Sequence, residues 1–209
     1  MHTLAELLSS AGYETRGVST NGNLGVGSGF SQGFDDYVDL GWCHDAGLVT
    51  AAVAHWGAPG PDDPPRFTWV HLTDAHAPYV RRGPWADALA QPARHPDLVA
   101  ESAADRDARL QRWSDRTDRE RRAREGVDLG SVGLESVIAL YDSELRAMDE
   151  VLADLVPRLG LRPGAVTIIT ADHGEELQDH GDFGHGNTLY REVLRVPLVI
   201  AGAPGAAAG

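Results

Sequence analysis

A dense group of acidic and histidine side chains follows an apolar segment near the end of the chain. Residues 165–171 are rich in β-branched side chains and predict a buried strand. Asp172 and His173 come directly after it, and Gly174 lets the backbone turn, so both side chains can reach one ion. Carboxylate oxygen with imidazole nitrogen suits zinc, manganese or iron, and calcium where the histidine is not a ligand. The sequence therefore predicts a metal site at Asp172 and His173.

A third side chain is expected to approach the same place. His185 lies between Gly184 and Gly186, on backbone that could fold back over the site. A second apolar run, 196–201, predicts another buried strand. Ligands of open α/β sheets bind outside the carboxyl ends of the strands, where these polar residues would lie. The alternative is a polar loop whose histidines face solvent.

The segment ADHGEELQDHGDFGHGNTLYREVLRVPLVI, residues 171–200, resembles the C-terminal metal-binding segment of the sulfatase family. That family belongs to the alkaline phosphatase superfamily, with phosphonate monoester hydrolases, phosphodiesterases and phosphoethanolamine transferases. The resemblance implies an α/β fold, a three-layer α/β/α sandwich with a mostly parallel sheet. It also implies one divalent metal ion, calcium in a sulfatase and manganese or zinc in a phosphodiesterase or transferase. Asp172 and His173 would supply half of its ligands.

A second motif carries the same resemblance. A predicted strand, 66–72, is followed by Asp74-Ala75-His76-Ala77-Pro78-Tyr79, which is similar to the D-x-H-x-P-Y of sulfatases. The resemblance makes His76 a substrate contact and a candidate general acid, a role suited to imidazole near neutral pH. His185 stands near where many sulfatases have a lysine and where phosphoethanolamine transferases have a metal-binding histidine. It is therefore expected to be a catalytic contact to the leaving group and substrate, or a further metal ligand.

The start of the chain resembles the part of the sulfatase catalytic domain that follows the nucleophile. Thr3-Leu4-Ala5-Glu6 is a capping box that predicts a short helix, and a strand is expected at 14–19. In sulfatases the nucleophile motif, C/S-x-P/A-x-R, and a strand with paired metal-binding aspartates lie upstream of this helix. Neither precedes it here, so the resemblance implies an N-terminally truncated member that is inactive by itself.

Two further positions bear on substrate binding and nucleophilic chemistry. Thr20 and Asn21 stand where sulfatases often have GKWH, whose lysine and histidine contact the sulfate, and could offer neutral hydrogen bonds instead. Cys43 lacks the proline or alanine and the arginine that the nucleophile motif requires, and is read as an incidental thiol.

The remaining elements position these residues. Helices are expected at 46–56 and 134–159, the second from apolar residues at 3–4 spacing. One partial catalytic domain is expected over 1–209, with a variable, insertion-like region at 81–130. Without its first strand the sheet is expected to expose an edge, which predicts self-association, although the oligomeric state stays open.

Composition limits the classes of partner. A net charge of −13 over 209 residues argues against a nucleic-acid or anionic-membrane binder. The chain has one cysteine and no lysine, and neither a membrane span nor a signal peptide is predicted, which makes the cytoplasm the default expectation.

The sequence thus predicts a metal-dependent hydrolase of sulfate esters, acting on a small-molecule or glycan ester. A phosphodiester or phosphonate monoester hydrolase, or a phosphoethanolamine-type transferase, is the first alternative, because phosphoryl and sulfuryl transfer make similar demands on the protein. A non-catalytic fragment that at most binds metal or an anionic ligand is the second.

Overall fold

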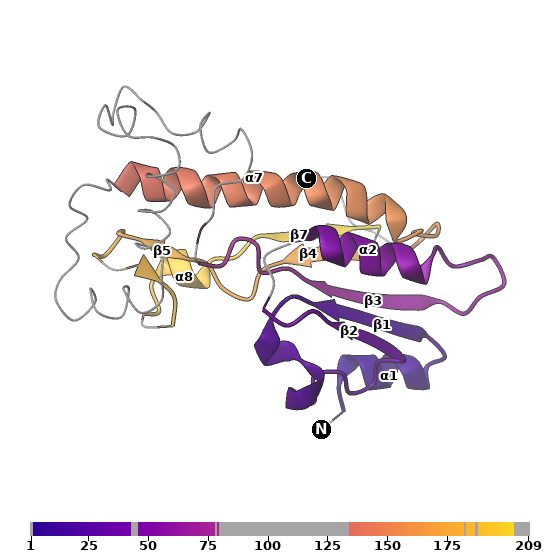
Figure 1. Ribbon diagram of the computed structural model, residues 1–209. Helices are drawn as coiled ribbons and strands as arrows, with labels where there is room; N and C mark the ends of the chain where they lie inside the picture. Colours follow the sequence, from indigo (N-terminus) through magenta and orange to yellow (C-terminus); the bar gives the residue numbers. More distant parts are fainter. Residues whose placement is uncertain are drawn as a thin grey trace. The chain divides into compact units, whose positions relative to one another are not determined.

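The computed structural model describes residues 2–42, 46–77, 79, 134–181, 183–186 and 188–202 (Figure 1). The chain divides into two compact units. The first unit comprises Met1–His76 with Met148–Leu161, and the second comprises Ala77–Ala147 with Arg162–Gly209. The predicted 81–130 region and Cys43 lie outside the described residues.

The first unit is built on a parallel sheet of three strands. Its order is β2 (Asp36–Asp39), β1 (Glu14–Ser19), β3 (Arg66–His71), and both pairs are parallel. The two longer strands match the predicted segments 14–19 and 66–72 closely. The parallel arrangement expected from the sequence is therefore present in this sheet.

Helices cover both faces of this sheet. The helix α2 (Ala46–Trp56) and the last part of α7 (Leu134–Arg158) pack on one face, whereas α1 (Leu4–Ser10) lies on the other (Figure 1). The core between α2, α7 and the sheet contains fully buried aliphatic side chains: Val18, Val49, Val53 and Leu155. This arrangement gives the first unit the three α/β/α layers that the sequence predicted.

The N-terminus of α1 has the predicted capping box. The backbone N–H of Glu6 donates to the Thr3 hydroxyl at 3.1 Å, and the Thr3 N–H donates to the Glu6 carboxylate at 2.8 Å. These bonds satisfy two backbone N–H groups that have no partner within the helix itself.

Aromatic rings meet across a glycine of β1. Gly17 pairs with Tyr37 on one side and Trp69 on the other, and these two rings stack with centroids 6.3 Å apart. A Cβ atom on Gly17 would lie 2.6 Å from the Tyr37 ring. The glycine is therefore required for the two rings to close over the central strand.

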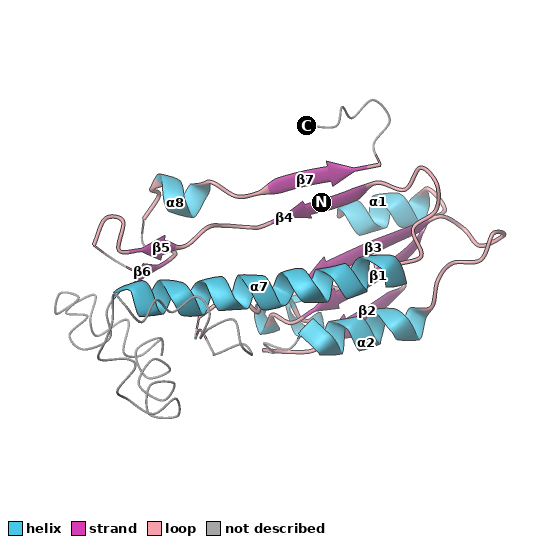
Figure 2. Cartoon of the chain, turned by 90° about the horizontal axis from the view of Figure 1, so that it is seen from above, coloured by secondary structure: helices cyan, strands magenta, loops and turns pink. Residues whose placement is uncertain are grey.

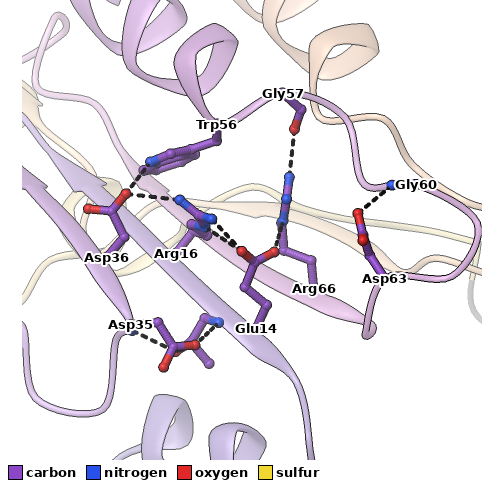
Figure 3. A network of polar contacts seen from close by, with 10 residues as sticks. Glu14, Arg16, Asp35, Asp36, Trp56, Gly57, Gly60, Asp63 and Arg66 are labelled. Carbon is purple, nitrogen blue, oxygen red and sulfur yellow. Dashed lines mark hydrogen bonds and ion pairs between the residues drawn. The ribbon is translucent and has the colours of Figure 1, made fainter.

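A charged network ties the three strands together (Figure 3). Glu14 on β1 accepts hydrogen bonds from Arg16 and from Arg66 on β3, the latter at 2.6 Å. Arg16 also donates to Asp36 on β2 at 2.9 Å, and the Trp56 indole donates to the same carboxylate oxygen at 2.8 Å. The network joins all three strands to the end of α2.

The second unit contains the first part of α7 and several short elements. β4 (Thr167–Thr170) and β7 (Leu198–Ala201) form an antiparallel pair, and β5 (Glu176–Leu177) and β6 (Phe183–Gly184) form a second one. The one-turn helix α8 (Arg191–Leu194) precedes β7 (Figure 2). The small core of this unit contains Ala77, Tyr79, Val137 and Leu140.

Both predicted strands near the C-terminus form, but the prediction that they are buried is wrong. Ile168 of β4 is 61% exposed and Leu198 of β7 is 65% exposed. Among the described residues each of these strands pairs only with the other, so apolar side chains on both faces stay accessible. The pairing is also antiparallel, unlike the sheet of the first unit.

Within the described part of the chain, no helix combines the length and the apolar character needed to cross a membrane.

Candidate functional site

The predicted metal ligands follow β4 and lie side by side. The Asp172 carboxylate oxygen Oδ1 and the His173 ring nitrogen Nε2 are 3.7 Å apart, and the Asp172 side chain is 71% exposed. The other ring nitrogen of His173, Nδ1, is 2.8 Å from the carbonyl oxygen of Gly174. Since a carbonyl only accepts, Nδ1 carries the proton and the lone pair of the neutral ring is on Nε2. Both atoms that face each other can therefore donate electrons to one cation.

A close backbone approach holds this turn in place. The N–H of Gly174 donates to the carbonyl of Val193 at 2.7 Å, and a Cβ on Gly174 would lie 1.9 Å from the carbonyl oxygen of Glu192. Sequence reasoning expected Gly174 to break the strand alternation. The structure adds a second reason for glycine, because no side chain fits between the turn and α8.

His185 folds back over the metal-ligand pair. It follows β6 and lies between Gly184 and Gly186, whose φ angles are 90° and 88°. Its ring stacks on that of His173 with centroids 3.8 Å apart and planes inclined by 28°. The second unit thus brings together three of the predicted site residues, Asp172, His173 and His185.

Two residues that the sequence analysis did not select support His185. Glu175 Oε1 is 3.0 Å from His185 Nδ1, and the Tyr79 hydroxyl donates to Glu175 Oε2 at 2.9 Å. The Glu175 side chain is only 6% exposed. The Tyr79 ring meets Tyr141 of α7 edge-on at 5.5 Å. Burial, followed by the negative charges of Glu175 and Asp142, raises the pKa of Tyr141.

A second carboxylate–histidine group lies nearby in the sequence. The ligand atoms of Glu176, His180 and Glu192 all lie within 4.8 Å of one another, so this group could also hold a metal. Hydrogen bonds already connect it: His180 Nδ1 is 2.5 Å from Glu192 Oε1, and the His180 N–H donates to buried Glu176 at 3.1 Å. Tyr190 stacks on the His180 ring at 3.8 Å. Metal binding at Asp172 and His173 must therefore be tested against this group.

The other predicted contacts belong to the first unit. His76 follows β3, where its N–H closes a turn onto the carbonyl of Thr73 at 2.9 Å, and its ring lies 6.1 Å from that of Trp42. Thr20 is fully buried, and its hydroxyl lies 2.9 Å from that of Thr73. Asn21 Oδ1 accepts from the Asn23 N–H at 2.9 Å. These bonds give Thr20 and Asn21 structural roles, and their contacts with substrate stay predictions.

The sequence also contains a formal match to the nucleophile motif. Ser102-Ala103-Ala104-Asp105-Arg106 has the S-x-A-x-R spacing, but it follows the first helix instead of preceding it and lies outside the described residues.

Comparison with known proteins agrees with the sequence motifs. The sequence model of the family named Sulfatase matches residues 1–208. A similar solved structure is that of BT4656 in complex with its substrate D-glucosamine-2-N,6-O-disulfate. The TM-score is 0.56 at 16% identity, and the match covers 96% of this chain but 55% of that one. The comparison with curated proteins found no match. The likeness confirms the predicted fold class, and this chain spans about half the length of its neighbour.

Proposed function

This chain belongs to the sulfatase family of the alkaline phosphatase superfamily, and we propose that it serves the metal-dependent hydrolysis of sulfate esters. The observation that carries the proposal is the cluster of Asp172, His173 and stacked His185 after β4. Such a cluster offers ligands to a cation and an imidazole beside them. Sulfuryl transfer builds negative charge on the oxygens of the ester, and a cation and a hydrogen-bonding imidazole would both stabilise that charge.

Asp172 and His173 would hold the metal. Their facing atoms, 3.7 Å apart, fit two ligands of one ion, and the Nδ1 bond to Gly174 fixes the ring tautomer that a metal needs. A bound divalent ion would polarise the ester oxygens and lower the pKa of a nucleophile. Calcium is the expectation from the resemblance to sulfatases. The imidazole nitrogen supports zinc or manganese instead if His173 is a direct ligand.

His185 and His76 would contact the substrate. His185 stacks on a proposed metal ligand, which supports a contact with an oxygen of the same ester. His76 is assigned to substrate by its D-x-H-x-P-Y motif, and Thr20 and Asn21 by their position after β1. The solved neighbour holds a sulfated sugar, which supports a sulfated glycan as one substrate class for this chain.

One feature favours phosphoryl chemistry as the second candidate. A histidine instead of a lysine at position 185 resembles the phosphoethanolamine transferases, in which the corresponding histidine binds metal. If His185 were a third ligand, then Asp172, His173 and His185 would form a carboxylate–imidazole set typical of zinc. Phosphodiester hydrolysis or transfer would then be the expected reaction.

Turnover on two esters separates these proposals. The full chain is incubated with calcium, manganese or zinc and assayed on an aryl sulfate and an aryl phosphodiester. If turnover is detected, we expect it to depend on the metal and to be faster on the aryl sulfate than on the aryl phosphodiester. Preference for the phosphodiester would replace the first proposal with the second. A protein that binds metal at Asp172 and His173 but cleaves neither ester would act as a binding module.

A further inference from the structure

A buried carboxylate connects two separate sequence motifs in the second unit. Glu175 follows the metal-ligand pair, and Tyr79 follows the D-x-H-x-P segment, 96 positions earlier in the chain. Tyr79 is 3% exposed and packs in the core of the unit, which fixes the direction of its hydroxyl. The hydroxyl donates to Glu175 Oε2 at 2.9 Å, so one oxygen of the carboxylate is anchored.

The other oxygen of Glu175 determines which nitrogen of His185 carries a proton. An ionised carboxylate has only acceptors, and Oε1 lies 3.0 Å from His185 Nδ1. Nδ1 must therefore be the donor, and the lone pair of the neutral ring is placed on Nε2. A neutral imidazole in water favours the opposite tautomer, with its proton on Nε2. The carboxylate thus selects a form that the free side chain would not adopt.

His185 is attached between two glycines. Gly184 and Gly186 both adopt positive φ angles, so the ring is attached to a segment with few side-chain restraints of its own. Its orientation comes from the hydrogen bond to Glu175 on one side and from stacking on His173 on the other. His173 is held in the same way, with Nδ1 on a backbone carbonyl. In both stacked rings, the unprotonated nitrogen is therefore Nε2.

We infer that Tyr79 and Glu175 are positioning residues for His185, which hold its imidazole as the Nδ1–H tautomer and make Nε2 the nitrogen that meets the ester. The role toward an ester rests on the proposed function. The tautomer itself does not, because it follows from the described contacts alone.

Nitrogen-15 spectra of the histidine rings test the tautomer directly. Long-range proton–nitrogen correlations of the full chain, recorded at a pH where the rings are neutral, distinguish protonated from unprotonated Nδ1. Wild-type His185 is expected to show a protonated Nδ1. In Glu175→Ala the ratio of the Nδ1–H to the Nε2–H form should fall about tenfold or more, because a hydrogen bond to a charged group is lost. Tyr79→Phe should lower the ratio less, since Glu175 remains.

A matched control is provided by the other histidine–carboxylate pair. Glu192→Ala removes the partner of His180 and should change the His180 signals while leaving those of His185 unaltered. An Nε2–H tautomer for His185 in the wild type would overturn the inference. So would an unchanged tautomer ratio in a Glu175→Ala protein whose backbone spectrum remains folded.

A kinetic measurement addresses the role toward the ester. Glu175→Gln should lower kcat on the preferred ester with metal content unchanged, because Asp172 and His173 are untouched. A wild-type protein without turnover would refute the role toward the ester in this chain, and the spectra would still decide the positioning of His185. An unchanged kcat in a Glu175→Gln protein with an altered tautomer would refute the role toward the ester.

Discussion

Glu14 stabilises the first unit by pairing with two arginines on neighbouring strands. Partial burial of its carboxyl group by itself would raise the pKa, but hydrogen bonds and attraction from Arg16 and Arg66 outweigh it, so the pKa of Glu14 is lowered. A lowered pKa means that folding favours the ionised form. The resulting stability is present above the ordinary pKa of 4.5 and is lost as the pH falls through the lower value in the folded protein.

Replacing Glu14 with glutamine should therefore change the acid sensitivity of the fold. We expect Glu14→Gln to lower the free energy of unfolding by about 1–3 kcal/mol at neutral pH, because charged hydrogen bonds to both arginines are lost. The difference from wild type should shrink as the pH falls below 4.5. Urea unfolding monitored at several pH values measures this, with Glu150→Gln, at an exposed position of α7, as the control. A constant difference at all pH values would contradict the assignment.

Some residues of the candidate site could be predicted from the sequence, and others could not. Asp172, His173 and His185 were predicted because they lie within one short segment after a strand, and local spacing suffices to bring them together. Glu175 lies in the same segment, but no role was predicted for it, because its partner Tyr79 is 96 positions away in the sequence. Contacts at that separation depend on how α7 and the segment after β3 pack, which no local pattern encodes.

At the scale of elements, the turn after β4 depends on its contact with α8. Gly174→Ala would place a Cβ 1.9 Å from the backbone oxygen of Glu192, an overlap that no side-chain rotation relieves. We expect a loss of about 1–3 kcal/mol in stability and weaker metal binding, because the turn that carries Asp172 and His173 must shift. Thermal unfolding and metal titration measure both effects.

A glycine in open space provides the comparison for that substitution. A Cβ on Gly27 would meet nothing within 4 Å, so Gly27→Ala should leave stability and metal binding close to wild type. If Gly174→Ala were tolerated equally well, the close approach between the turn and α8 would not be a requirement of the fold.

The three longer helices and the strands β1, β3, β4 and β7 were predicted to within a few residues, whereas β2, β5, β6 and α8 were not predicted. Apolar periodicity predicted α7, the capping box predicted α1, and a helix was expected at 46–56, where α2 forms. The same apolar signal made β4 and β7 appear buried, yet Ile168 and Leu198 are exposed. The burial of a strand depends on which other elements pack against it. A hydrophobic run in the sequence indicates only that the strand has apolar side chains.

At the scale of the whole molecule, exposed apolar strands favour self-association. The β4 and β7 strands have unpaired edges among the described residues, and a free edge can pair with another chain. The net charge of −13 opposes such contacts by repulsion. We therefore expect association that increases with salt concentration, as the repulsion is screened. Light scattering across dilution and salt series measures it.

A charge placed on the exposed strand face tests the location of that contact. Ile168→Arg should reduce association, because an arginine on a 61% exposed position disfavours apolar pairing without disturbing the core. Leu7→Arg on α1, which is 57% exposed, is the matched change elsewhere and should have little effect. Equal effects of both substitutions would indicate that total charge, and not the β4–β7 face, controls association.

The most direct test of the account is the metal content of the purified chain. After dialysis against calcium, manganese or zinc, elemental analysis should find bound metal in the wild type and in His180→Gln. The Asp172→Asn, His173→Gln double variant should have lost it while remaining folded. Metal retained in that double variant but lost in His180→Gln would place the ion at Glu176, His180 and Glu192 instead. That outcome would contradict the central claim that the aspartate–histidine pair after β4 forms the metal site.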